Sequence, residues 1–206
     1  MSGKKAAKRK VDSRVTRSRD ALGDALLALM QEKRFESITV QQILDRAEIG
    51  RSTFYSHYRD KDDLLLSDLE DFFEKISTLL LDRKENSTRV LPAREFFQHV
   101  AEMRHLHIIL IAADKQRDFL ELGQGYFARA IERRLEVLPA TRTVPLLRRT
   151  AAAQAFAGAF LSLLSWWMAQ PAPPSPAEMD ETFHRMFWSG VPAESAAITP
   201  TNPHVK

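Results

Sequence analysis

The sequence contains no cysteine in its 206 residues. The chain therefore forms no disulfide framework, offers no thiolate to a metal ion and has no cysteine nucleophile. The same absence fits a reducing cytoplasm, where disulfides are rare. The first residues, MSGKKAAKRKVDSR, are charged or small and lack the apolar core of a signal peptide. We therefore expect a cytoplasmic protein.

Sequence motifs of common enzyme classes are also missing: there is no P-loop, no GxGxxG, no GxSxG and no HExxH. His99, His105 and His107 come nearest to a metal cluster. However, His105 and His107 are two residues apart and do not share a helix face, and no carboxylate triad joins them. We expect no metal site, no cofactor and no enzymatic activity. The rival reading, an enzyme in the second half, requires a convergent acid–base pair in a pocket.

The most informative stretch is residues 39–64, TVQQILDRAEIGRSTFYSHYRDKDDL. Thr39 and Gln42 form a capping box, and Ile38 and Ile43 have the spacing of a hydrophobic staple. A helix is therefore predicted to start at Val40. The segment Glu48-Ile49-Gly50 interrupts this helix and predicts a turn.

A second short helix is predicted from about Arg51 to Tyr58, and Asp60 is predicted to cap a third. Phe54 and Tyr58 are four residues apart and can face inward together. The hydrogen-bonding side chains left facing outward are Arg51, Ser52, Thr53, Tyr55 and Ser56. Two short helices joined by a tight turn, the second with a polar outward face, are typical of a helix-turn-helix.

The run ITVQQILDRAEIGRSTFYSHYRDKDDLL resembles the DNA-binding signature of the TetR/AcrR family of transcriptional regulators, with the specific part at residues 22–69. Two positions depart from the family pattern. Glu48 stands where the family has the turn glycine, and Gly50 stands where it has a capping serine or threonine. We interpret this as a glycine that has moved two residues along the turn.

The resemblance and the side-chain chemistry together predict a DNA-binding surface. Arg51 is suited to a two-bond contact with guanine, and the Thr53 methyl group to contact with a thymine methyl. The resemblance places Tyr55, His57 and Lys61 on the phosphate backbone; for Tyr55 and His57 the alternative is packing on the fourth helix. The predicted DNA-binding residues are Thr39, Gln41, Arg51, Ser52, Thr53, Tyr55, His57 and Lys61.

The charge is concentrated at the start of the chain. The net charge is +3, but residues 1–19 carry eight lysines and arginines against Asp12 alone, a charge of +7 that leaves −4 for the remainder. A basic arm beside a helix-turn-helix favours phosphate contacts or insertion into the minor groove. The open alternative is a solvated tail, since blocks of like charge are disordered in either case.

Apolar periodicity predicts helices throughout the rest of the chain. The expected fold is all-α, with a three-helix, homeodomain-like helix-turn-helix unit followed by a C-terminal helical bundle, about nine helices in all. The predicted divisions are a disordered arm at 1–13, a DNA-binding domain at 14–60, a ligand-binding and dimerisation domain at 61–190 and a disordered tail at 191–206.

The second half contains apolar side chains whose spacing predicts core but also fits the wall of a ligand site. The candidate ligand-binding residues are Phe96, Phe97, Met103, Tyr126, Phe156, Phe160 and Trp167. The sequence alone does not separate these two roles.

Residues 144–170 form the longest apolar stretch, and residues 151–168 carry no charge. A membrane span is the lesser alternative here, because Gln154 and several alanines and serines make the stretch weakly apolar. A stripe of small residues and a following helix favour a homodimer interface. The predicted interface residues are Ala151, Ala155, Ala159, Ser162, Trp166, Phe183, Met186 and Phe187.

The sequence therefore predicts a homodimeric regulator of transcription that binds double-stranded DNA at a palindromic operator. By resemblance, we expect a repressor that a small-molecule effector of unknown identity releases from the operator, with no membrane association. The alternative is a DNA-binding regulator that responds to a protein partner, or an architectural DNA-binding protein, without a small ligand. The latter predicts a well-packed second domain.

Overall fold

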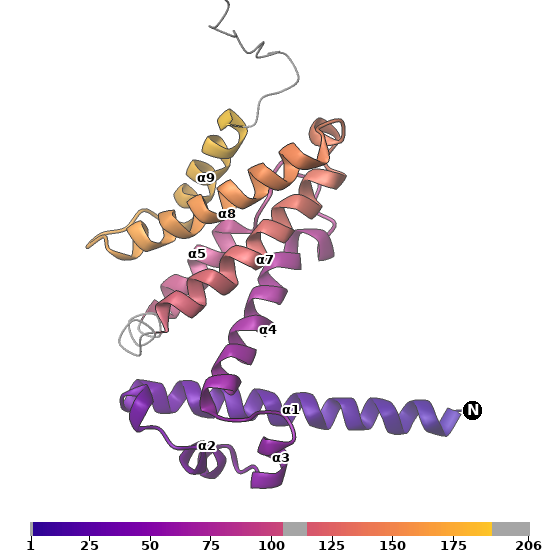
Figure 1. Ribbon diagram of the computed structural model, residues 1–206, viewed down its shortest axis with the longest axis vertical. Helices are drawn as coiled ribbons and strands as arrows, with labels where there is room; N and C mark the ends of the chain where they lie inside the picture. The colour runs from indigo at the N-terminus through magenta and orange to yellow at the C-terminus, as the bar shows by residue number, and fades with distance from the viewer. Residues whose placement is uncertain (1, 105–114, 191–206) are drawn as a thin grey trace, which may run out of the picture. The chain divides into compact units, whose positions relative to one another are not determined.

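The computed structural model of the protein describes residues 2–104 and 115–190, with side chains from residue 15 onward. Within these ranges the chain is all-α, as predicted, with eight α-helices and no strand (Figure 1). The α-helices are α1 (Ser2–Glu32), α2 (Val40–Ala47), α3 (Arg51–Tyr55), α4 (Lys61–Asp82), α5 (Ala93–Glu102), α7 (Gln116–Val137), α8 (Leu146–Met168) and α9 (Pro176–Gly190). Two short 3-10 helices are η1 (Phe35–Ser37) and η2 (Pro139–Thr141). The predicted tail, and His105 and His107, lie outside the described residues.

The described residues fall into two compact units. The N-terminal unit contains those of Met1–Phe73 and Val100–Leu122, and the C-terminal unit those of Glu74–His99 and Gly123–Lys206. The helices α4, α5 and α7 each contribute to both units. For this reason the units do not coincide with the divisions that the sequence predicted at residue 60, where only local helix signals were used.

α1 differs from the sequence-based expectation at its start. The helix begins at Ser2, so residues 2–13, which were expected to be disordered, are helical in their backbone. This segment contains no proline and is rich in lysine, alanine and arginine, which are good helix formers. The predicted contacts of its side chains with phosphate or the minor groove stay a prediction.

The N-terminal unit is built on the apolar face of α1. Leu22, Leu26 and Met30 of α1 are buried, and so are Ile43 and Leu44 of α2, which packs against α1. Burying these faces removes apolar surface from water, which supplies the main driving force for the unit.

Arg19 adds a polar link between α1 and α4. Its guanidinium donates to the Tyr58 hydroxyl at 3.1 Å, to Ser67 at 2.9 Å and to Asp71 at 2.9 Å. Hydrogen bonding to Tyr58 is the main reason why the pKa of Arg19 is raised. The link joins α1 to Tyr58 and to the N-terminal half of α4.

The C-terminal unit is organised around aromatic rings from α5, α7, α8 and α9. Phe96 and Phe97 of α5 lie 5.4 Å and 5.5 Å from the ring of Phe160 on α8, and Phe160 lies 4.9 Å from both Phe127 of α7 and Phe183 of α9. These rings are fully buried. Edge-to-face contacts of this kind add to the stabilisation from burial alone.

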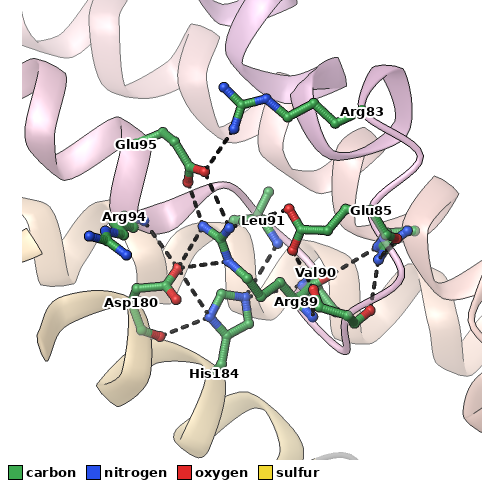
Figure 2. Close-up of polar contacts among 11 residues, drawn as sticks. Arg83, Glu85, Arg89, Val90, Leu91, Arg94, Glu95, Asp180 and His184 are labelled. Atoms are coloured by element: carbon green, nitrogen blue, oxygen red, sulfur yellow. Dashed lines mark hydrogen bonds and ion pairs between the residues drawn. The ribbon is translucent and has the colours of Figure 1, made fainter. Parts of the chain in front are cut away.

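α9 is fastened to the loop between α4 and α5 by a charged network (Figure 2). Arg89 of the loop pairs with Glu85 and Glu95, and its Nη2 lies 3.0 Å from Asp180 Oδ1. His184 accepts the backbone N–H of Val90 at 3.1 Å through Nε2.

Burial is the first reason why the pKa of His184 is lowered, and the contact through Nε2 also requires a neutral ring. Arg134 of α7 donates to the carbonyl oxygens of Glu85, Ser87 and Arg89 from the other side. The loop is therefore held by both α7 and α9.

α8 is long and apolar enough to cross a membrane by length and composition, with a mean hydropathy of 1.2, and among the described helices it alone meets that test. Its buried residues, which include Phe160, Leu164 and Trp167, belong to the core of the C-terminal unit. Buried residues make up 33% of the most apolar stretch of the helix.

Asp68 of α4 faces Gly23 of α1, and there is no room at position 23 for a side chain larger than that of glycine. A Cβ atom at Gly23 would lie 2.5 Å from Asp68 Oδ2, which is buried and has no hydrogen-bond partner among the described residues. Burial, followed by the carboxylate of Asp71, raises the pKa of Asp68 to about 7. Asp20 and Asp24 add to the rise, and Arg19 opposes it.

The raised pKa makes the charged form of Asp68 unfavourable in the folded protein. This destabilisation is present in full above about pH 7 and disappears as the pH falls toward the unfolded value near 4. We expect Asp68→Asn to raise the free energy of unfolding by about 1–3 kcal/mol at pH 8, and by progressively less down to pH 4. Urea unfolding of the natural protein and of Asp68→Asn between pH 4 and pH 8 measures this difference in the free energy of unfolding.

The matched control is Asp82→Asn, which changes an exposed aspartate at the end of the same helix. It should leave the pH dependence unchanged. Equal pH profiles for Asp68→Asn and the natural protein would show that Asp68 is ionised without cost.

Candidate nucleic-acid interface

α2 begins where the sequence predicted, because Thr39 and Gln42 form the capping box. The Thr39 side chain accepts the Gln42 N–H at 3.3 Å, and the Gln42 side chain accepts the Thr39 N–H at 3.1 Å. Ile43 and Leu44 face the core, whereas Gln41 and Asp45 are exposed. One face of α2 is therefore polar and open.

The turn between α2 and α3 corrects the interpretation of a moved glycine. Glu48 itself takes the left-handed conformation, with φ 54° and ψ 37°, as the C-cap of α2. Gly50 has φ −71° and ψ 146°, which any residue can adopt, and a Cβ atom added there would meet nothing within 4 Å. The left-handed residue of the turn is therefore at position 48, where the family has glycine, and here a glutamate takes this strained conformation.

α3 presents polar side chains to solvent because its apolar side is buried. Phe54 is fully buried and Tyr58 is 4% exposed, with their ring centroids 5.6 Å apart. As a consequence Arg51 and Ser52 are exposed, Tyr55 is 53% exposed and Thr53 is half-buried. His57 follows on the exposed side.

Arg51 and Gln41 are brought together across the turn. Arg51 Nη2 donates to Gln41 Oε1 at 2.7 Å, and Gln41 Nε2 donates to Asp45 Oδ1 at 2.7 Å. Arg51 and Gln41 were predicted from the sequence to belong to this surface, whereas Asp45 was not. The available signal was its place four residues after Gln41 on the same helical face.

Lys61 has a different environment from the one predicted. Its ammonium group donates to the backbone oxygens of Phe35 at 2.6 Å, Glu36 at 3.1 Å and Ile38 at 2.9 Å, and lies 4.6 Å from the centre of the Phe35 ring. An ammonium group has three donors, and all three are used here. Lys61 thus joins the start of α4 to η1, and its contact with phosphate stays a prediction.

The predicted ligand-binding residues are distributed unevenly. Phe96, Phe97 and Phe160 lie together in the aromatic core, and Trp167 is 5.1 Å from Phe97. Phe156 packs on Phe187 at 4.6 Å, Tyr126 is covered by the Arg129 guanidinium, and Met103 belongs to the N-terminal unit.

The predicted interface stripe on α8 is open to solvent. Ala151, Ala155, Ala159 and Ser162 are exposed, and Trp166 is 49% exposed. Leu147, four residues before Ala151, extends this stripe and is 80% exposed. The sequence analysis missed Leu147, although its spacing gave the signal.

On α9 the prediction is wrong for two of its three residues. Phe183 and Phe187 are fully buried within the chain's own core, where Phe183 contacts Phe160. Met186 is 44% exposed and is therefore free to contribute to an interface. Helical spacing identified the apolar residues of α9 but not the side on which α8 lies.

The geometry of α2 and α3 agrees with comparisons to known proteins. The family described as "Bacterial regulatory proteins, tetR family" matches residues 22–67. These residues include the capping box, the turn, α3 and the start of α4. Over 64 residues the chain is 39% identical to an uncharacterised HTH-type transcriptional regulator, YxbF, of Bacillus subtilis (strain 168), a match to 31% of this chain and 17% of that protein.

Solved structures resemble a larger part of the chain. A TetR transcriptional regulator from Streptococcus agalactiae 2603V matches with a TM-score of 0.52 and 24% identity, over 87% of this chain and 98% of that one. A putative TetR-family regulator from Syntrophomonas wolfei matches with a TM-score of 0.59, 20% identity and coverages of 84% and 93%. The dihydroxyacetone kinase operon activator DhaS matches with a TM-score of 0.58, 15% identity and coverages of 84% and 94%. At these identities the likeness is one of fold.

The conformation of the turn leads to one prediction for Glu48 and another for Gly50. Glu48→Gly should raise the free energy of unfolding by about 1 kcal/mol, because glycine takes a left-handed conformation without strain. Gly50→Ser should be neutral or stabilising by up to about 1 kcal/mol, since it adds a capping side chain and restricts the unfolded chain. Urea unfolding measures both. A loss of stability in Gly50→Ser would restore the interpretation of a moved glycine.

Proposed function

Because residues 22–67 match the family described as bacterial regulatory proteins of the tetR family, we propose that the chain is a member of that family and a sequence-specific, DNA-binding regulator of transcription. The single observation that carries this proposal is the outward face of α3. Arg51, Ser52 and Tyr55 are exposed there because Phe54 is buried beneath them. A short helix with such a face is suited to the major groove.

The chemistry of this face fits both kinds of DNA contact. Arg51 is able to form two hydrogen bonds with O6 and N7 of guanine, and the small Ser52 allows the helix to approach the base edges. Tyr55 and His57 are exposed on the same side and are suited to phosphate oxygens. Base contacts would set the sequence preference, and phosphate contacts the position of the helix.

We assign the exposed stripe of α8 to a homodimer interface. Small side chains at Ala151, Ala155 and Ala159 allow a second helix to come close, and Leu147 and Trp166 supply apolar contact at the two ends of the stripe. A two-fold dimer presents two copies of α3, which matches a palindromic operator with half-sites about 34–36 Å apart. Such a protein acts in the cytoplasm.

Release by a small molecule is the response that we propose for the C-terminal unit, with repression as the resulting activity. Its support is the concentration of aromatic side chains that α5, α7, α8 and α9 contribute to one region. A ligand there would have to separate rings that now contact one another. DhaS is named as an operon activator, so activation is the alternative for the sign of regulation.

A second candidate is regulation by a protein partner, without a small ligand. The observation in its favour is the mutual packing of Phe96, Phe97, Phe127 and Phe160, which is what a well-packed second domain predicts. Titrating DNA binding with candidate ligands separates the two. A ligand that binds the protein yet leaves its affinity for DNA unchanged would favour the second candidate.

Replacing Arg51 tests the recognition surface. Arg51→Ala should weaken binding to a duplex selected from a randomised pool by about 1–3 kcal/mol and relax the preference at one base position in each half-site. The control is Arg133→Ala, which removes the same charge from an exposed position on α7. Anisotropy titrations measure both. If Arg51→Ala binds the selected duplex with unchanged preference, α3 is not the reading helix.

Replacing one alanine tests the interface. Ala155→Glu should give a monomer with weak DNA binding, because a charge in the stripe loses its water of hydration when the two copies associate. Ala177→Glu is the matched control, since Ala177 is exposed in the first turn of α9 and outside the stripe. Sedimentation velocity gives the answer, and a dimer that persists in Ala155→Glu would place the interface elsewhere.

A further inference from the structure

We propose that Asp45 is a positioning residue for sequence recognition, which acts through Gln41 to hold Arg51 in the orientation that reads a base. The inference rests on the proposed function, since it concerns the same DNA-reading surface. It also changes the role of Gln41, which was predicted to contact DNA and is here assigned to the support of Arg51.

The geometry is a chain of two hydrogen bonds. Asp45 Oδ1 accepts from Gln41 Nε2 at 2.7 Å, and Gln41 Oε1 accepts from Arg51 Nη2 at 2.7 Å. A carboxylate only accepts hydrogen bonds, and a guanidinium only donates them. The reversed amide would face its NH₂ group toward the guanidinium and its oxygen toward the carboxylate. Asp45 therefore determines which end of the Gln41 amide faces Arg51.

The local structure explains why these residues meet. Gln41 and Asp45 are four residues apart on α2 and share an exposed face, a spacing at which glutamine and aspartate side chains pair. Arg51 is the first residue of α3, directly after the turn that Glu48 makes in its left-handed conformation. The hydrogen bonds thus connect the two helices of the helix-turn-helix at its solvent side.

Holding Arg51 leaves most of its hydrogen-bonding capacity unused. A guanidinium group has five N–H donors, and Gln41 accepts one of them. The remaining donors suffice for a two-bond contact with guanine O6 and N7. A free arginine side chain samples many rotamers, and losing that freedom on binding costs affinity. A partner that holds the side chain beforehand reduces this cost.

A carboxylate on a surface that meets DNA has a cost of its own. Negative charge repels phosphate and weakens binding to every sequence. Two acids of the same unit are paired with arginine, Glu32 with Arg46 and Asp63 with Arg59. Asp45 instead bonds to the Gln41 amide, so its charge remains. The two effects of Asp45 on DNA binding can be separated. Its charge weakens binding to every DNA sequence, whereas its acceptor oxygen affects sequence preference through Arg51.

Two substitutions in the full chain separate these effects. Asp45→Asn removes the charge and keeps an acceptor oxygen, whereas Asp45→Ala removes both. The probes are a duplex selected from a randomised pool by the natural protein and a shuffled duplex of the same composition. Anisotropy titrations give the ratio of the two affinities for each protein, and thermal melting checks that each variant folds.

Both variants should bind the shuffled duplex more tightly than the natural protein, and by a similar factor. Asp45→Ala alone should lower the ratio of selected to shuffled affinity, by about twofold to tenfold. In an Arg51→Ala background Asp45→Ala should leave the ratio unchanged, because the residue that it positions is gone. A general loss of structure would lower the ratio in both backgrounds.

The inference is overturned if Asp45→Ala leaves the ratio at its natural value, or if Asp45→Asn lowers it as much as Asp45→Ala. It is also overturned if Asp45→Ala lowers the ratio to the same extent without Arg51. Failure of the proposed function has a different signature. In that case no duplex is enriched by the natural protein, or Arg51→Ala by itself leaves the ratio unchanged.

Discussion

The burial of Phe54 and Tyr58 is the constraint on which the proposed DNA-reading surface depends. Both lie on one side of the segment that begins with α3, and burying them leaves the other side to Arg51 and Tyr55. Tyr58 also accepts a hydrogen bond from Arg19, which binds Asp71 of α4 as well. The same contacts that fold the N-terminal unit therefore orient α3 and set the start of α4.

Two residues of this unit are less favourable for folding than their neighbours would allow. Glu48 is left-handed, and Asp68 places against Gly23 a buried oxygen that has no hydrogen-bond partner among the described residues. Strained or poorly satisfied groups are tolerated where the surrounding structure determines them. Here the surrounding helices are fixed by apolar burial, so these costs lower stability without changing the fold.

Local signals made a large part of the structure predictable. The capping box at Thr39 gave the first residue of α2, since the atoms involved are three residues apart, and the structure has the same arrangement of Ser175 and Glu178 at the start of α9. Asp60 accepts the Asp63 N–H at 2.8 Å and caps α4, again as predicted. The family resemblance then pointed to the outward face of α3 as the proposed DNA-reading face.

Contacts between residues far apart in the sequence were not predictable. Lys61 is bound to carbonyl oxygens more than twenty residues away, so its spacing gave no sign of this role. Helical periodicity showed that Phe183 and Phe187 are apolar but not that α8 covers them. Aromatic spacing likewise left packing and ligand binding unseparated in the C-terminal unit.

The most direct test of the account uses the absence of cysteine in the chain. Ser56→Cys introduces a single thiol directly after α3, at an exposed position outside the proposed contact residues, to which an iron chelate that cleaves nearby DNA is attached. The expected result is cleavage of a selected duplex in two symmetric clusters about one helical turn apart, and none from the same chelate at Ser189→Cys on α9. Cleavage spread evenly along the duplex from Ser56→Cys, or confined to the α9 derivative, would contradict this expectation.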